Sequence, residues 1–494
     1  MSQSTMTSVR ARAAGDRWEG DLTRRLLASA ALTTEDPGSR IAPGTFHDWF
    51  AEQARAHRYV TSRVGFPALS GWRFAPGTGN LEHESGRFFT VEGLRVHRDG
   101  GPVESWTQPV IVQPEIGVLG ILMKEFGGVL YCLMQAKMEP GNIGPLQLSP
   151  TVQATRSNYT GVHRGRRVPY LEYFTESGRG RVLTDVLQSE QGAWFLHKRN
   201  RNVVVVTDED VPVLDGFRWM TLGRLGRLLH ADNLVNMDAR TVLASLPLTA
   251  AGELPGTADD AFTAALRRSM DPAAGTVHSM TEILSWLTAA RSRRELRQER
   301  IPLVETARDG WTTESEVIRH RDGEYFSVIA VDVRAGNREV SRWGQPLLAP
   351  AARGFAGLLT ARIGGVLHVL LQAQVESGTL NVAEVGPTVM CLPEAGPDTP
   401  DEHRPPFWDL VLSAPPRSRR LDVVLSEEGG RFFHAVTRYV IVDAGDGPLP
   451  DVPRDHCWIA VHQAAELLRH SNYVNVQART LLACLSTLWP TGRA

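Results

Sequence analysis

Lysine is almost absent from this chain of 494 residues, which contains only Lys124, Lys137 and Lys198 among its 53 basic residues. Cysteine is scarce as well. The four cysteines lie far apart, form no CxxC pair and have no histidine at metal-ligand spacing. The cysteines therefore give no metal-site pattern and are best interpreted as buried thiols in a reducing cytoplasm.

Long apolar runs and a strong charge of one sign are missing too. No apolar run reaches about 18 residues, so no membrane-spanning helix is predicted. Residues 1–15 lack the apolar centre of a secretory signal. A formal net charge of -2 gives no basic field for nucleic acid or an anionic membrane. We therefore expect a cytoplasmic protein that binds neither, with residues 1–40 as an N-terminal tail.

Motifs of common cofactor chemistry are also absent. No GxGxxG follows a strand, and the chain has no GxxxxGK[ST], HExxH or GxSxG motif. This disfavours a dinucleotide-dependent dehydrogenase and a P-loop NTPase. The stretch from Arg294 to Glu299 resembles the metal-binding helix of Nudix hydrolases, but one carboxylate and the flanking glycines are missing. A solvated, charged helix face is the favoured interpretation.

The sequence contains a tandem duplication. When it is shifted by 237 residues, its first half aligns with its second, and a further slip of two residues extends the match toward the end. The aligned segments include Trp106-x-Gln108-Pro109 with Trp343-x-Gln345-Pro346, Gly127–Leu130 with Gly364–Leu367, Pro150–Val152 with Pro387–Val389, and Ala239–Thr241 with Ala478–Thr480. Such a match predicts two similar modules related by a pseudo-twofold axis.

Each half is predicted to be α+β, with a mixed or mainly antiparallel sheet and flanking helices. Thr45 and Ser279 are expected to cap the helix that opens each half. Strands joined by glycine turns follow, and helices near 219–231 and 237–246, the second capped by Asp238, close the first half. We place the first repeat at 41–247, a linker with a helix near 258–269 at 248–278, and the second repeat at 279–494.

One strand of the first repeat ends in polar groups. Residues 129–138 are β-branched and apolar, and alternation directs Gln135 and Lys137 to one face, with Glu139 next in register. Burying an unpaired Lys or Glu is costly, so these groups must meet each other, a ligand or water. A purely structural Lys–Glu pair is the alternative. The second repeat argues against it, because it keeps Glu376 but has Gln374 in place of the lysine.

Other polar residues allow both a structural and a functional interpretation. Trp106 and Gln108 recur in both repeats, which favours packing over a stacking wall for a ligand. Arg199 and Arg201 fit either a soluble edge strand or a diphosphate clamp. His163 and His230 lack partners at ligand spacing and are interpreted as ordinary loop or helix-end residues.

Four motifs together resemble those of the NDP-hexose 2,3-dehydratases of deoxysugar biosynthesis. They are QAKMEPGN (135–142), QLSPTVQATRSNY (147–159), DVLQSEQGAWFLHKRNRN (185–202) and NLVNMDARTVLASL (233–246). With the duplication, the resemblance covers about residues 41–489. It implies two Nudix-like modules without the Nudix metal box, a homodimer, and neither a metal nor a bound redox cofactor.

The resemblance also implies a lyase acting on a substrate such as dTDP-4-keto-6-deoxyglucose. A base removes the C3 proton, the C2 hydroxyl leaves as water, and the product is a 3,4-diketo-2,6-dideoxy sugar. A separate NADPH-dependent 3-ketoreductase would take this product. We expect the main chemistry in the first repeat, because the second has diverged at the same positions and fits a scaffold or an auxiliary site.

Roles at the site are assigned as hypotheses. Glu139 is the expected base, Lys137 the group that stabilises the enolate oxygen, and Tyr159 the acid or hydroxyl donor. Tyr170, Glu172 and His163 remain alternatives for the acid or base. The expected ligands of the sugar, thymidine or diphosphate are Trp106, Gln108, Gln135, Asn142, Gln147, Thr151, Gln153, Arg156, Ser157, Asn158, Arg199 and Arg201.

Two other functions remain open. A catalytically inactive nucleotide-sugar binder would keep the same pocket, although the intact Lys137 and Glu139 argue against it. A Nudix-type diphosphohydrolase would require a carboxylate helix for Mg²⁺, and this helix is incomplete.

Overall fold

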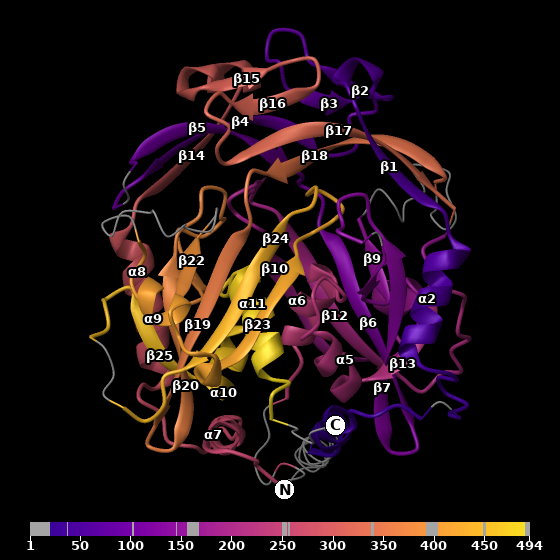
Figure 1. The fold of residues 1–494 in the computed structure, drawn as a ribbon, viewed down its shortest axis with the longest axis vertical. Coiled ribbons are helices and arrows are strands. Elements are labelled where there is room, and N and C mark those ends of the chain that lie inside the picture. Colours follow the sequence, from indigo (N-terminus) through magenta and orange to yellow (C-terminus); the bar gives the residue numbers. More distant parts are fainter. Residues whose placement is uncertain are drawn as a thin grey trace, which may run out of the picture.

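The computed structural model describes residues 20–489, apart from residues 37, 101–102, 145, 156–166, 249–253, 255–256, 337–339, 392–403 and 448–450. The described chain is α+β and contains four sheets (Figure 1). Two large sheets lie side by side, and two smaller sheets arch over one end of them (Figure 1). None of the described helices is long and apolar enough to cross a membrane.

Each half contributes one seven-stranded mixed sheet. The first-half sheet has the order β10-β12-β6-β7-β13, with β8 on β7 and β9 on β6. The second-half sheet has the order β21-β20-β19-β24-β23, with β22 on β19 and β25 on β20. The pairs β12–β6 and β24–β19 are parallel. The strands are β6 (Gly117–Phe126), β7 (Val129–Met138), β8 (Leu146–Ser149), β9 (Val152–Ala154), β10 (Arg181–Ser189), β12 (Arg199–Thr207), β13 (Phe217–Thr221), β19 (Gly354–Ile363), β20 (Val366–Gln374), β21 (Glu384–Gly386), β22 (Val389–Cys391), β23 (Arg419–Ser426), β24 (Val436–Asp443) and β25 (His456–Ala460).

The two upper sheets exchange strands between the halves. Strand β1 of the first half pairs antiparallel with β17 of the second, and β14 of the second half pairs antiparallel with β4 of the first. Neither upper sheet is therefore built by one half alone. Their strands are β1 (Tyr59–Val64), β2 (Trp72–Phe74), β3 (Leu81–His83), β4 (Thr90–Arg98), β5 (Ser105–Val112), β11 (Phe195–Leu196), β14 (Leu296–Ile301), β15 (Trp311–Thr313), β16 (Val317–His320), β17 (Phe326–Ala335) and β18 (Arg342–Pro350).

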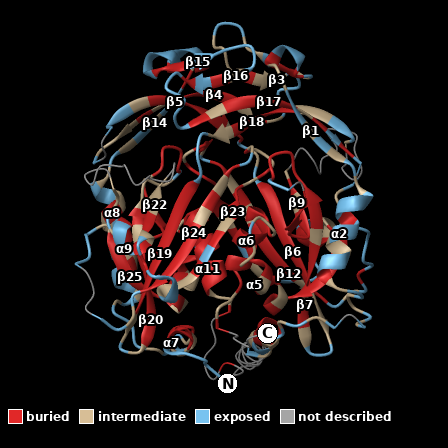
Figure 2. Cartoon of the chain, viewed as in Figure 1, coloured by how far each residue is buried: buried red, intermediate tan, exposed pale blue. Residues whose placement is uncertain are grey.

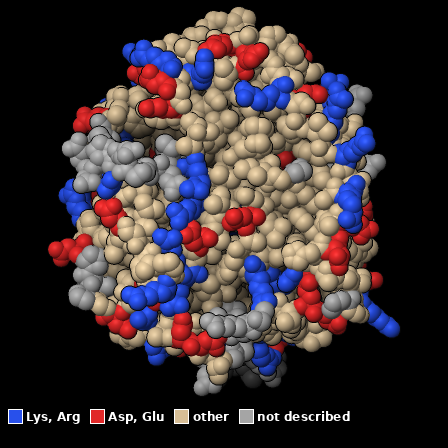
Figure 3. Space-filling view, viewed as in Figure 1, with Lys and Arg blue, Asp and Glu red and all other residues tan. Residues whose placement is uncertain are grey.

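Helices α6 and α11 lie between the two large sheets and are buried along almost their whole length (Figure 2). Both belong to one hydrophobic core that draws residues from both halves. On the face shown in Figure 3, by contrast, basic and acidic side chains are interspersed, mostly toward the edges. Residues 20–31 are helical. The other helices are α2 (Phe46–Ala56), α4 (Glu172–Thr175), α5 (Leu222–Leu228), α6 (Met237–Ala244), α7 (Ala261–Ser269), α8 (Met280–Arg293), α9 (Trp408–Leu412), α10 (Val461–Leu467) and α11 (Val476–Leu485), with 3₁₀ turns at Phe66–Ala68, Leu303–Asp309 and Pro416–Ser418.

Two buried arginines join the halves through matching hydrogen bonds. Arg240 of α6 donates to the Ser426 carbonyl (2.7 Å) and to Thr480 Oγ1 (3.3 Å). Arg479 of α11 donates to the Ser189 carbonyl and to Thr241 Oγ1 (both 2.5 Å). Both side chains have no solvent exposure, and burying an arginine is tolerable because its donors are satisfied in this way.

Several local predictions are confirmed and three are wrong. Thr45 caps α2, and Ser279 with Glu282 forms a capping box on α8. Asp238, however, lies in the first turn of α6, and the N-cap is Asn236. Residues 219–221, predicted as helix, belong to β13. The prediction failed here because an apolar run of this length fits a buried strand as well as a helix. The stretch Arg294–Glu299, predicted as a charged helix face, follows the end of α8, and its residues from Leu296 onward belong to β14. The Nudix-like relationship and the pseudo-twofold axis stay predictions.

Candidate active site

Lys137 and Glu139 lie together at the buried end of β7. Lys137 is 7 % exposed and Glu139 is 4 % exposed. Gln153 of β9 contacts both: Lys137 Nζ donates to the Gln153 carbonyl (3.1 Å), and Gln153 Nε2 donates to Glu139 Oε1 (2.8 Å). Gln153 is held in turn by Asn236 at the start of α6 (3.2 Å). The sequence placed Lys137, Glu139 and Gln153 in one site, and they lie together in the structure.

A loop of the second half completes this site. The backbone N–H of Gly141 donates to the Gly429 carbonyl (2.8 Å), and Gln147 shares hydrogen bonds with Ser426. A side chain on Gly141 would lie 1.6 Å from the Phe432 carbonyl oxygen, so only glycine permits this approach. The segment 426–431 is thereby held against the end of β7.

Glu428 of this loop lies beside Glu139. One carboxylate oxygen of each, Oε1 in both cases, lies within 3.5 Å of the point that a Cβ on Gly430 would occupy. The second oxygen of Glu428, Oε2, is buried and has no hydrogen-bond partner among the described residues. Burial raises the pKa of Glu428 and the charge of Glu139 adds to the rise, whereas Arg431, Lys198 and Lys137 oppose it.

Four further charged groups surround these residues. Burial lowers the pKa of Lys198, although Glu190 and Glu428 act against this shift. Burial raises the pKa of Glu190 to about 7. Asp238 has a pKa well above the usual range because of burial, with Glu428, Glu190 and Glu139 adding to the effect. Burial also lowers the pKa of Arg431, and the surrounding carboxylates counteract it. We call Lys137, Glu139, Gln153, Glu190, Lys198, Asn236, Asp238, Glu428 and Arg431 the first-half site.

The equivalent positions of the other repeat are largely neutral. Lys137, Asp238, Lys198, Glu428 and Arg431 correspond to Gln374, Gln477, Ala435, Gln191 and Trp194, whereas the carboxyls Glu139 and Glu190 correspond to the carboxyls Glu376 and Glu427. Matching backbone contacts support this correspondence, because Gly378 donates to Gly192 (2.6 Å) as Gly141 does to Gly429. The fold is therefore maintained without these charges, and a purely structural reason for them is disfavoured.

Sequence reasoning missed most of this charged set. Lys198, Glu190, Glu428 and Arg431 were not candidates, and Asp238 was interpreted as a cap. Two signals were available: Lys198 is one of only three lysines, and the repeat aligns Ser426-Glu427-Glu428-Gly429 with Ser189-Glu190-Gln191-Gly192.

Trp106 and Gln108 lie away from Lys137. Trp106 Nε1 donates to Gln108 Oε1 (2.8 Å), and Gln108 Nε2 donates to the Ala193 carbonyl (2.9 Å). Ala193 belongs to the loop that contacts Glu376 of the second half. The tryptophan–glutamine pair nearest the first-half site is instead Trp343 and Gln345, because Gln345 Nε2 donates to the Gly430 carbonyl (2.8 Å).

Several other predicted ligands make structural contacts. Thr151 Oγ1 donates to the Leu133 carbonyl and accepts from the Leu122 N–H (2.8 Å), as Thr388 does in the second half. Arg201 forms a bidentate ion pair with Asp185, which Arg438 and Asp422 repeat. These paired contacts favour roles in the fold for Thr151 and Arg201.

The remaining predicted ligands fall into three groups. Gln135 is partly exposed on β7 and Arg199 opens β12 with a buried Nε that has no partner among the described residues. Asn142 is buried against Gly429, and its side-chain amide has no partner in the described part of the chain either. Arg156, Ser157, Asn158, Tyr159 and His163 lie outside the described residues.

The alternative acid Tyr170 is engaged elsewhere. Its hydroxyl donates to the Pro212 carbonyl (2.7 Å) and accepts from the Leu214 N–H (2.9 Å). Burial raises the pKa of Tyr170. Glu172 lies in the first turn of α4, next to this tyrosine. Neither residue is among the groups that shift the pKa of Glu428 or Asp238.

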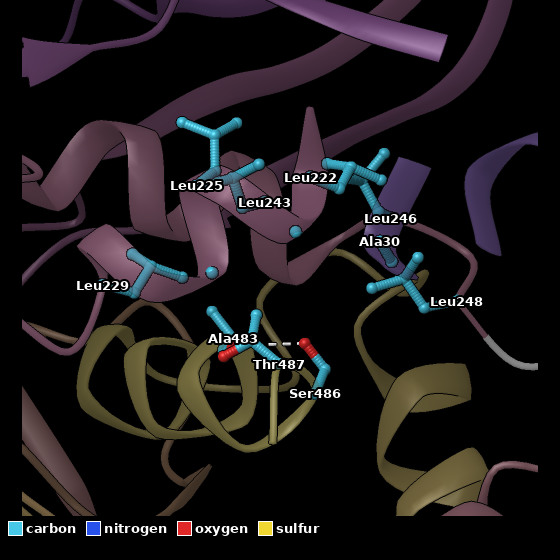
Figure 4. Close-up of a pocket in the computed structure, with 12 residues that line it drawn as sticks. Ala30, Leu222, Leu225, Leu229, Leu243, Leu246, Leu248, Ala483, Ser486 and Thr487 are labelled. Atoms are coloured by element: carbon cyan, nitrogen blue, oxygen red, sulfur yellow. Dashed lines mark hydrogen bonds between the residues drawn. The ribbon is translucent and has the colours of Figure 1, made fainter. Parts of the chain in front are cut away.

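Two cavities elsewhere do not offer the same chemistry. The first, of about 20 Å³, lies between α5, α6 and α11 and is lined by leucines and alanines, with Ser486 donating to the Ala483 carbonyl (Figure 4). It contains no ionisable group. The second is an open cleft of about 590 Å³ whose lining includes Arg55, His57, Arg58 and Met138, but no lysine and no carboxylate. Alternation along β7 directs Met138 to the face opposite Lys137.

Glu384 allows a direct test of the cost of buried carboxylates outside the first-half site. It accepts a hydrogen bond from Ser189 Oγ (2.5 Å), and its other oxygen has no partner among the described residues. Burial raises the pKa of Glu384 from 4.5 to about 7, although Ser189, Arg479 and Arg291 oppose the rise. The corresponding residue of the first repeat is the amide Gln147.

We predict that Glu384→Gln increases the free energy of unfolding, relative to the wild-type, by more at pH 8 than at pH 5. Because the folded pKa lies above the unfolded value, the folded state binds more protons between about pH 4.5 and 7. The wild-type therefore loses stability over this range, on the order of 3 kcal/mol from this group. The variant lacks this loss. Denaturant unfolding of both proteins at pH 5 and pH 8 checks the prediction. If the free energies of unfolding of variant and wild-type differed by the same amount at both pH values, the prediction would be contradicted.

Comparison with known proteins gives a consistent family match. The profile of the NDP-hexose 2,3-dehydratase family matches residues 44–246 and 280–485. A dTDP-4-dehydro-6-deoxy-α-D-glucopyranose 2,3-dehydratase of Saccharopolyspora spinosa is 48% identical over 473 residues, which is 95% of this chain and 96% of the relative. Enzymes of the same description from Streptomyces violaceoruber (48% over 447 residues, 90% and 97%) and Amycolatopsis orientalis (46% over 471 residues, 94% and 94%) are similarly close.

Proposed function

The chain belongs to the NDP-hexose 2,3-dehydratase family, and we propose that it removes water from C2 and C3 of dTDP-4-keto-6-deoxyglucose. The product is a dTDP-3,4-diketo-2,6-dideoxyhexose, an intermediate of deoxysugar biosynthesis. In class, the enzyme is a lyase.

The chemistry requires three groups around the hexose. The C4 ketone acidifies the C3 hydrogen, so a base removes this proton and the negative charge gathers on the C4 oxygen. We assign the base to Glu139 and the stabilisation of the oxygen to Lys137. A positioned donor to such an oxyanion contributes roughly 3–4 kcal/mol, and a positioned base about 10²–10⁴-fold in rate. The C2 hydroxyl then leaves with the help of an acid.

The observation that carries this assignment is the contrast between the repeats. Among the described residues, a base, an ammonium group and further carboxyls converge only in the first-half site. The fold is kept where the counterparts of Lys137, Glu428 and Asp238 are the amides Gln374, Gln191 and Gln477. An inactive binder of the same nucleotide sugar would have no need of this set.

The same proposal leads to expectations about the pathway partner, the assembly and the cofactors of the enzyme. The diketo product is unstable, so an NADPH-dependent 3-ketoreductase would consume it in the cytoplasm. We expect a homodimer of chains, each composed of two Nudix-like modules related by a pseudo-twofold axis. We expect the reaction to require neither a metal nor a redox cofactor.

The proposal is tested by incubating the purified protein with dTDP-4-keto-6-deoxyglucose, with and without a 3-ketoreductase and NADPH. We expect loss of the 2-hydroxyl in both reactions and a stable 2-deoxy product where the reductase is present. Tight binding without loss of the hydroxyl would identify the inactive binder instead. Mg²⁺-dependent release of dTMP would identify a diphosphohydrolase.

A further inference from the structure

We propose that Glu428, which the second half of the chain supplies, is the acid that protonates the departing C2 hydroxyl in the first-half site. This inference rests on the proposed function and adds a catalytic residue to it. Both repeats are then needed for one active site, because the base comes from the first and the acid from the second.

The geometry places Glu428 where such an acid is needed. Its Oε1 and Glu139 Oε1 converge on one point beside Gly430. When Glu139 faces C3 of the hexose, the neighbouring C2 therefore lies within reach of Glu428. The contacts Gly141–Gly429 and Gln147–Ser426 fix this loop on both sides of Glu428. These contacts between the halves therefore fix the position of Glu428.

A structural role does not account for Glu428. Its buried Oε2 has no partner among the described residues, an arrangement that costs free energy unless it serves a function. At the corresponding position the first repeat has Gln191, whose Nε2 donates to Glu427 (2.8 Å). An amide therefore fits the same loop, and the carboxyl is an added feature.

The surroundings favour a protonated carboxyl. Burial and the charge of Glu139 raise the pKa of Glu428, against the cations Lys137, Lys198 and Arg431. The other two carboxyl neighbours, Asp238 and Glu190, also have raised pKa values because of their burial. A carboxyl whose pKa is raised keeps its proton to higher pH and is then able to donate it to a leaving oxygen.

The proposed step balances in protons and electrons. Glu139 takes the C3 proton, and the electrons of the C3–H bond form the enolate on C4. When the C4 carbonyl re-forms, these electrons become the C2–C3 double bond and the C2–O bond breaks. The oxygen takes the proton of Glu428 and leaves as water. Glu139 is then protonated and Glu428 ionised, and solvent returns both to their initial states while the enol ketonises.

Glu428→Gln separates loss of the C2 hydroxyl from the earlier removal of the C3 proton. The variant repeats Gln191 in size and polarity, so we expect a folded protein. In D₂O it should still exchange the C3 hydrogen of the substrate for deuterium, because Glu139 and Lys137 remain. Loss of the 2-hydroxyl should fall by about 10²–10⁴-fold, and the remaining activity should lose the decline at high pH that ionisation of Glu428 causes in the wild-type.

A matched control and the opposing outcomes complete the test. Glu384→Gln makes the same chemical change in a buried carboxyl of the second half and should leave elimination unchanged. Full elimination by Glu428→Gln would overturn the proposal and transfer the role to another acid, with Tyr159 next to test. Loss of deuterium exchange together with elimination would also overturn it, because Glu428 would then act before the leaving step. Absence of both reactions in the wild-type would instead refute the proposed function.

Discussion

Replacing Glu139 with glutamine is expected to abolish both deuterium exchange at C3 and loss of the 2-hydroxyl. The amide keeps an oxygen that can accept the hydrogen bond from Gln153 (2.8 Å in the wild-type), but it cannot remove a proton. We expect a loss on the order of 10²–10⁴-fold in kcat, with affinity for the nucleotide sugar almost unchanged. Steady-state kinetics and ligand binding measured on the same protein check both parts.

The duplication provides a control for this variant. Glu376 is the equivalent carboxyl, and burial raises its pKa to about 8, so it is mostly neutral at pH 7. Glu376→Gln should therefore leave the activity unchanged. If the Glu139 variant kept full activity, the base would have to be sought elsewhere, and if the Glu376 variant lost activity, the chemistry would not belong to the first half.

Replacing Lys137 with glutamine is expected to have the second largest effect. The change reproduces Gln374 of the second repeat, so the fold should persist. It removes the ammonium group that we assign to the enolate oxygen, whose stabilisation is worth roughly 3–4 kcal/mol per donor. Exchange at C3 and elimination should both fall by about 10²–10³-fold, since both proceed through the enolate.

A second lysine of the chain serves as the control for that variant. Lys124 lies near the other end of the first-half sheet, where its Nζ donates to the Asp208 carbonyl (3.4 Å) and the Glu209 carbonyl. Lys124→Gln should not change the rate of exchange. If the Lys137 variant exchanged C3 at the wild-type rate while elimination fell, Lys137 would act on the leaving group and not on the enolate.

The first-half strand and its polar end could be predicted from the sequence. β7 spans Val129–Met138, in agreement with the alternation and the glycine turn before it. The capping residues Thr45 and Ser279 were equally clear, because their hydrogen bonds are local. Lys137 and Glu139 were recognised for the same reason, because they lie only two positions apart in the sequence.

Contacts between the halves could not be predicted in this way. The pairing of β1 with β17 and of β14 with β4 joins segments that are far apart in the sequence, and such pairing leaves no local periodic signal. Glu428 likewise approaches Glu139 only through contacts between the halves, Gly141 with Gly429 and Gln147 with Ser426. Trp106 was assigned to the wrong neighbourhood for the same reason, since a repeated motif does not reveal which of two equivalent loops it contacts.

The central claim is that the hexose reacts between Lys137, Glu139 and Glu428. The most direct measurement is a crystal structure of the Glu139→Gln variant with dTDP-4-keto-6-deoxyglucose bound. We expect the C4 oxygen within hydrogen-bond distance of Lys137 Nζ, C3 facing residue 139, and the C2 hydroxyl facing Glu428. A substrate bound only beside Gln374 and Glu376, or a Lys137 side chain directed into solvent away from the sugar, would contradict this account.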